Sequence, residues 1–122
     1  MEVKTTLVNG AAIAVVHSKE PLFEDVQGAL DFMMTVQYGT GSSRILLNKA
    51  ALPGGFFILS NGMAGGILQK FVNYHMKLAI VGDYSAYTSK PLRDFIHESN
   101  RGRDIFFVST EEDGLEKLSR AE

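Results

Sequence analysis

The stretch Lys77–Val108, KLAIVGDYSAYTSKPLRDFIHESNRGRDIFFV, decides the fold class. It opens and closes on short apolar runs, Leu78–Val81 and Ile105–Val108, which are typical of strands buried on both faces. Between them lies an expected helix, Lys90–Asn100, with Ser89 as N-cap, Pro91 in the first turn and Gly102 as its end. Its apolar face follows the helical period through Leu92, Phe95, Ile96 and Ser99. A strand, a helix and a strand in this order predict two parallel strands joined by a right-handed crossover.

The same alternation continues upstream of this stretch. Val3–Val8 and Ala11–His17 flank Asn9-Gly10, the favoured pair for a two-residue hairpin turn. Apolar residues then recur at a helical period over Phe23–Tyr38, where Gly39 is the expected stop. A buried strand is predicted over Arg44–Lys49, a short helical turn over Phe56–Ser60, and a second helix over Gly62–Tyr74.

Downstream, Thr110 and Asp113 predict the N-terminal cap of a last helix, Glu111–Ser119. Leu118–Glu122 are expected to fray at the end of the chain. The sequence therefore predicts one α/β domain over residues 1–122. Its N-terminal β-hairpin is followed by alternating α and β units, which form a mixed, mostly parallel sheet of about four to five strands flanked by helices.

Composition excludes several classes of function. Hydrophobic residues make up 45% and charged residues 21% of the chain, which argues against bulk disorder. The net charge of -2 supplies no basic field, so nucleic acid is not the expected partner. The absence of Cys removes disulfides, thiolate catalysis and cysteine zinc sites. The three histidines are dispersed, so no metal and no cofactor are expected. Without a signal peptide or a long apolar run, we expect a cytoplasmic protein with no membrane segment.

Five of the 12 glycines fall between Gly54 and Gly66. Glycines before a helix can let backbone N–H groups cradle an anion. However, Gly66 is followed by Ile67 and Leu68, so the Gly-Lys-Ser/Thr of a P-loop is missing, and the spacing of a dinucleotide fingerprint is missing too. We interpret the glycines as positions where a helix packs closely on the sheet, with flexible entry into that helix.

The chemistry-bearing residues gather after the strand Leu78–Val81. Ligands in open parallel sheets tend to bind outside the carboxyl ends of strands, where Asp83 is expected to lie. The candidate ligand or partner residues are Asp83, Tyr84, Ser85, Tyr87, Lys90, Arg93, His97, Asn100 and Arg101. The alternative to a binding site is a purely structural role, in which Asp83 and Ser89 hydrogen-bond to local backbone groups of a turn and a solvated helix face follows.

A set of segments shares one further feature; they are Gln69–Tyr74, Lys77–Ser85, Ser89-Lys90 and Leu92–Gly102, with extensions to Ala29–Phe32 and Phe106–Val108. Together these segments resemble the bacterial family known as domain of unknown function 4180. This resemblance covers most of the chain after the hairpin and implies no known activity. The layout also resembles anti-sigma-factor antagonist (STAS) domains, in which a serine that opens a helix can be phosphorylated by a partner kinase. Ser60-Asn61-Gly62-Met63 lies in a comparable place, so this resemblance implies Ser60 as a phosphorylation site.

Two hypotheses remain open. The first is a small non-enzymatic regulatory or protein-interaction domain, STAS-like, that meets a partner protein or a second copy as a homodimer. Its candidate surfaces are Phe56-Phe57 and the helix face with Arg93 and His97. The alternative is a small enzyme or ligand-binding protein with a pocket at the strand ends. There Asp83 would be a general base or a hydrogen-bond anchor, and Arg93 an anion clamp. No catalytic residue is assigned.

Overall fold

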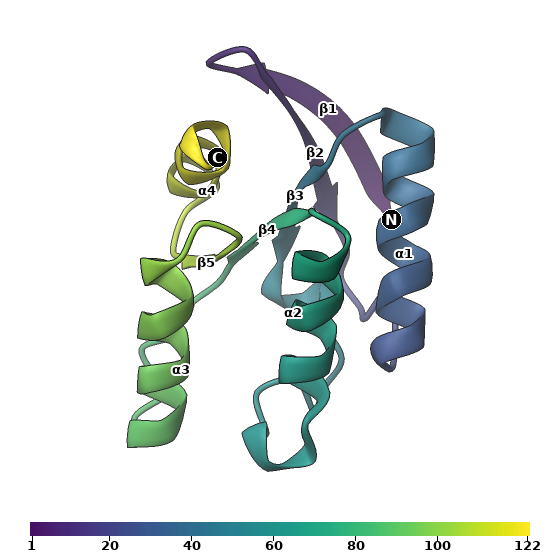
Figure 1. Ribbon diagram of the computed structural model, residues 1–122. Coiled ribbons are helices and arrows are strands. Elements are labelled where there is room, and N and C mark those ends of the chain that lie inside the picture. The colour runs from purple at the N-terminus through teal and green to yellow at the C-terminus, as the bar shows by residue number, and fades with distance from the viewer.

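The computed structural model describes residues 1–122 and contains one five-stranded sheet, in the order β1-β2-β3-β4-β5 (Figure 1). β1 (Glu2–Val8) pairs antiparallel with β2 (Ala11–His17). The sheet continues in parallel through the three remaining strands, β3 (Arg44–Asn48), β4 (Lys77–Val81) and β5 (Ile105–Val108). The predicted fold class, a hairpin followed by alternating units around a mostly parallel sheet, is confirmed.

The first turn has the backbone that its two residues favour. Asn9 and Gly10 have φ of 51° and 81°, and positive φ at both central residues defines the hairpin turn whose twist matches that of the strands. The register runs without interruption from Val8 opposite Ala11 to Glu2 opposite His17. The predicted hairpin is therefore confirmed, and β1 forms one edge of the sheet.

Three helices cover one face of the sheet and the fourth covers the other, as Figure 1 lets the reader follow. The first face carries α1 (Val26–Thr40), α2 (Met63–Asn73) and α3 (Lys90–Arg101), over a core of 21 buried residues. The opposite face carries α4 (Glu111–Arg120) over a smaller cluster of 7. Consecutive right-handed crossovers through neighbouring strands place all their helices on one side. None of the four helices combines the length and apolarity that crossing a bilayer requires.

The ends of α1 differ from the prediction. The helix begins after Asp25, whose carboxylate accepts from Gly28 N at 2.7 Å, and Phe23 lies buried in front of it. Gly39 is not the stop, because the helix continues to Thr40 and ends at Gly41, which has φ of 74°. Periodicity predicts that a helix is present, but it does not distinguish Gly39 from Gly41 as the residue that ends it.

The other elements lie close to their predicted bounds. α3 begins after Ser89, as predicted, although that side chain makes no capping hydrogen bond. Thr110 does cap α4, since its hydroxyl accepts from Asp113 N at 3.1 Å. The short helical turn lies at Leu59–Asn61, and a second one, Lys49–Ala51, follows β3.

The glycine-rich stretch contributes packing, with one difference in detail. A Cβ at Gly66 would lie 2.8 Å from Val26 Cγ2, so this glycine brings α2 against α1, not against the sheet. Gly62 has φ of 76° and begins α2. Phe56, expected on a surface, is fully buried in the core, because its ring packs against Phe57 and Phe107.

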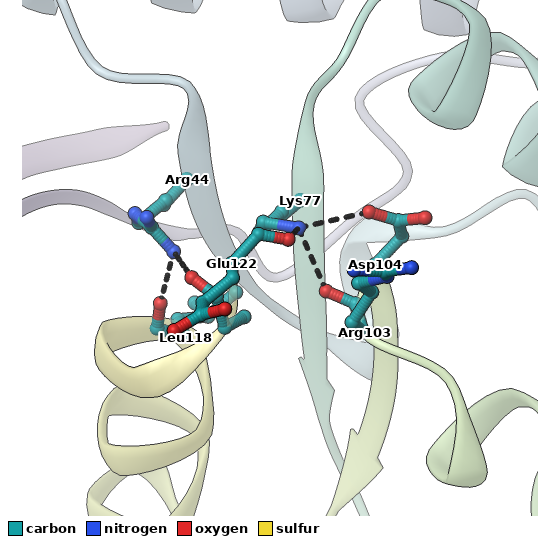
Figure 2. A network of polar contacts seen from close by, with 7 residues as sticks. Arg44, Lys77, Arg103, Asp104, Leu118 and Glu122 are labelled. Atoms are coloured by element: carbon teal, nitrogen blue, oxygen red, sulfur yellow. Dashed lines mark hydrogen bonds and ion pairs between the residues drawn. The ribbon is translucent and has the colours of Figure 1, made fainter.

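The expected fraying of Leu118–Glu122 is wrong. Leu118 is fully buried, and Arg44 Nη1 donates to the carbonyls of Leu118 and Ala121. Lys77 Nζ donates to Glu122 O at 2.9 Å and also reaches Asp104 Oδ1 (Figure 2). Arg44, at the start of β3, thus satisfies carbonyls at the end of α4, and Lys77, at the start of β4, holds Glu122, which follows the helix and its cap.

Candidate functional site

The carboxyl edge of the parallel sheet gathers the ends of β3 and β4. Lys49 follows β3, and Gly82 and Asp83 follow β4. The strand order advances in one direction from β2 to β5, so the sheet has no point at which the order reverses and opens a crevice. Side chains at this edge therefore meet in surface hollows beside α3 and beside Lys49.

One groove, of about 670 Å³, lies between α3 and the loop after β4. We call it the α3 groove, and it is lined by Tyr84, Tyr87, Lys90, Arg93, Asp94, Ile96, His97 and Asn100. The structure thus brings together six of the nine candidate ligand or partner residues. Helical spacing explains the alignment, since Arg93, His97 and Asn100 are three and four residues apart and share a face of α3.

The polar groups of the α3 groove differ in whether the protein already engages them. Lys90 is paired with Asp94, one helical turn away. Arg93 has no carboxylate within 4.0 Å, and the same is true of His97. The groove therefore presents an unpaired guanidinium beside an imidazole.

Two groove residues use their polar side-chain atoms in hydrogen bonds to the backbone. Asn100 Nδ2 donates to Phe107 O at 3.1 Å, and its Oδ1 accepts from Phe107 N at 2.6 Å. The hydroxyl of Tyr84 donates to Ile80 O at 2.7 Å. Burial raises the pKa of Tyr84, because a phenolate would lose its hydration there, and the neighbouring Tyr87 adds to the shift. Both side chains therefore shape the groove and hold its walls.

The remaining candidates lie outside the α3 groove. Asp83 Oδ1 accepts from Ser85 N at 3.0 Å. Hydrogen bonds from the Ser85 side chain and backbone lower the pKa of Asp83, and the charge of Lys49 contributes less. Arg101 Nη1 lies 3.8 Å from Glu98 Oε1, and both side chains are exposed. Ser60 is exposed in the turn before α2, which is where phosphorylation would need it.

A second hollow, of about 560 Å³, lies beside Lys49, and its lining includes Asp83, Phe57, Pro53 and Tyr87. Lys49 Nζ lies 4.2 Å from the centre of the Tyr87 ring, 5.6 Å from that of Phe57 and 5.7 Å from that of Tyr84. Distances of this size are those of cation–π contacts. Nζ also donates to Asp83 O at 3.3 Å. Tyr87 lines both this hollow and the α3 groove.

Sequence reasoning missed Lys49, and it singled out Phe57 only as part of a candidate interaction surface, not as a neighbour of Asp83. The signal for Lys49 was present, because it follows a predicted parallel strand and therefore had to lie at the same edge as Asp83. Phe57 carried no such signal, since the path of the chain after β3 decides where its ring lies. No three His, Asp or Glu side chains gather where they could hold a metal ion.

Comparisons with known proteins add a family and no activity. The family model described as "Domain of unknown function (DUF4180)" matches residues 8–118. No curated protein and no solved structure matches the chain. The match confirms the family resemblance, and the likeness to STAS domains stays a prediction.

Proposed function

We propose that this chain, which belongs to the DUF4180 family of domains of unknown function, is a non-enzymatic binding domain whose α3 groove receives an anionic group. The group is a carboxylate or a phosphate. The observation that carries this proposal is the Arg93 guanidinium, which lines the groove without any carboxylate partner in the protein.

The surroundings of Arg93 suit an anion. A guanidinium offers a planar fork of donors that matches two oxygens of a carboxylate or phosphate. Lys90 and His97 line the same groove, and Asp94 is the one carboxylate there. Because Asp94 is paired with Lys90, it competes little for Arg93. Tyr84, Tyr87 and Ile96 add apolar walls for the body of a ligand.

Binding is favoured over catalysis by the position of Asp83. The enzymatic alternative needs Asp83 as a general base beside Arg93, but Asp83 lines the hollow beside Lys49 and bonds to Ser85 N. The depressed pKa of Asp83 also weakens it as a base near neutral pH. The regulatory role expected from the sequence needs only recognition, which the α3 groove supplies.

The test is an NMR titration of the ¹⁵N-labelled chain with inorganic phosphate and with succinate, at constant ionic strength set by NaCl. We expect saturable amide shifts around Tyr87 and from Lys90 to Asn100, and loss of saturation in Arg93→Gln. Arg101→Gln is the matched control, because it removes an arginine of the same helix that lies outside the groove. Equal shifts with NaCl alone, or an unchanged response in Arg93→Gln, would contradict the proposal.

A second arm identifies the source of the anion. A peptide of consecutive glutamates is titrated in parallel with succinate, which carries the same carboxylates on a small molecule. Tighter binding of the peptide indicates an acidic segment of a partner protein. Tighter binding of phosphate or succinate indicates a small ligand.

A further inference from the structure

The two edges of the sheet differ in how well they are protected from pairing with another strand. At the β5 edge, the strand has four residues, all buried, and Asn100 occupies the outward-facing N–H and C=O of Phe107. At the β1 edge, the strand has seven residues, most of them exposed. It contains no proline, and its unbroken register leaves no bulge. Short length, proline, bulges and a covering side chain are among the features that protect natural edge strands from pairing. β1 has none of these four, and its charged side chains are Glu2 and Lys4.

The hairpin register determines which backbone groups of β1 are free. In a two-residue hairpin, the residues that flank the turn, here Val8 and Ala11, exchange both hydrogen bonds. Hydrogen-bonded and non-bonded pairs then alternate, so the even-numbered residues of β1 bond to β2. The N–H and C=O groups of Val3, Thr5 and Leu7 therefore point away from β2, along the open edge.

The side chains of these three residues form a row on one face of the sheet. Val3 stands opposite Val16, which belongs to the core under α1, so the row lies on the α1 face. Val3 is 37% exposed and Leu7 73% exposed. The edge thus offers free backbone groups and two exposed apolar side chains, with Thr5 midway between them.

We propose that β1 pairs antiparallel with β1 of a second copy of this chain, about a two-fold axis at Thr5. Val3 then faces Leu7 of the other copy, and Thr5 faces its own counterpart. All three positions present free N–H and C=O groups, and both apolar side chains gain an apolar partner.

Charge disfavours one of the two neighbouring registers. A two-fold axis perpendicular to the sheet keeps each side chain on its own face, so the axis passes through one residue. An axis at Lys4 would bring two lysines directly opposite each other, which is destabilising. With the axis at Thr5, Lys4 faces Thr6. The segment Glu2–Val8 is thus complementary to itself, which favours a second copy over an unrelated extended peptide.

Sedimentation velocity tests the pairing. We expect a dimer for the wild type at high protein concentration and a monomer for Thr5→Pro. Proline removes an N–H that faces away from β2, and edge strands tolerate proline at such positions. Thr5→Val is the matched control, because it keeps the N–H and is expected to remain dimeric. Thermal unfolding verifies that each variant is folded. A monomeric wild type at millimolar concentration, or a dimeric Thr5→Pro, would overturn the proposal.

A cross-linking experiment does not depend on Thr5→Pro. The chain has no cysteine, so Thr5→Cys introduces a single thiol at the proposed axis. Opposite residues of a bonded antiparallel pair lie about 5.5 Å apart at Cα, within the range of disulfides. Oxidation should convert Thr5→Cys to a covalent dimer and leave Thr6→Cys, which would face Lys4 on the opposite face, as a monomer. Equal cross-linking of the two variants would rule out this register.

Discussion

Asn100 holds Phe107 by both of its backbone groups, with the side-chain amide donating to the carbonyl at 3.1 Å and accepting from the N–H at 2.6 Å. This pair fastens the last turn of α3 to β5 and closes that edge of the sheet. It also fixes the position of Arg93 and His97, which lie on the same helix. One asparagine therefore supports the α3 groove without contributing a free polar atom to it.

Asn100→Ala is expected to lower the free energy of unfolding by about 1–3 kcal/mol. The reason is that Phe107 is buried, so its N–H and C=O would lose their partners where water has little access. Urea unfolding measures the change. Asn73→Ala is the control, because Asn73 is exposed and bonds only to Gln69, and we expect a change within about 0.5 kcal/mol. Equal losses of unfolding free energy in the two variants would contradict a stabilising role of the two hydrogen bonds to Phe107.

Gly114→Ala and Gly65→Ala are expected to have opposite signs. A Cβ at Gly114 would lie 2.9 Å from Leu46 Cδ1 and 3.2 Å from Val108 Cγ2, and overpacking of this kind costs about 1–3 kcal/mol. Most of that range exceeds the gain of about 1 kcal/mol from alanine's helix propensity. Gly65 has nothing within 4 Å of its would-be Cβ, so the propensity gain stands alone and stabilises the chain. The thermal midpoints should fall and rise, respectively, and two rises would refute the close contact at Gly114.

The sequence predicted the order of elements and the face of α3 because both depend on local periodicity. Arg93 and His97 share a face through helical spacing alone. The sequence did not predict which polar side chains are already hydrogen-bonded to the backbone. Asn100 reaches Phe107, and Tyr84 reaches Ile80, only after the sheet has formed. The expected frayed terminus failed for the same reason. Arg44 lies 74 residues before Leu118 in the chain, and no local pattern connects them.

Arg44→Leu is expected to loosen the last turn of α4. The guanidinium donates to the carbonyls of Leu118 and Ala121, and hydrogen bonds from charged donors are worth about 1.5–3 kcal/mol. Amide hydrogen exchange should accelerate in this turn, and the free energy of unfolding should fall. Arg120→Leu is the control, because Arg120 pairs only with Glu116 at the surface and should change stability by less than about 1 kcal/mol. Unchanged exchange in Arg44→Leu would contradict the role of these bonds.

Tyr84→Phe is expected to cost about 1 kcal/mol near neutral pH, through loss of the hydrogen bond to Ile80 O. The cost should shrink at alkaline pH. Burial raises the pKa of Tyr84 in the folded state, so its contribution is complete below the ordinary value of 10.0 and declines as the pH rises above it. Urea unfolding from pH 7 upward measures the difference between the two proteins. Tyr38→Phe, at a position 95% exposed, serves as the control, and a difference that stays constant with pH would refute the burial effect.

Ser85→Ala is expected to raise the pKa of Asp83 toward the ordinary value of 3.8, because the hydrogen bond from the Ser85 side chain is the largest cause of its depression, whereas the bond from the Ser85 backbone N–H remains. A ¹³C NMR titration of the Asp83 carboxyl carbon measures this. Any stabilisation from the depressed pKa exists above the ordinary value and declines as the pH falls below it.

Two further variants separate the causes of that shift. Lys49→Met should raise the pKa of Asp83 less than Ser85→Ala does, because the charge of Lys49 is the smaller contribution. Thr88→Ala, in the same exposed loop, should leave it unchanged. A larger rise in Lys49→Met would mean that the cation sets the state of Asp83. In that case the hollow beside Lys49 would be an electrostatic pair, and the loop between β4 and α3 would owe its shape to charge instead of to hydrogen bonding.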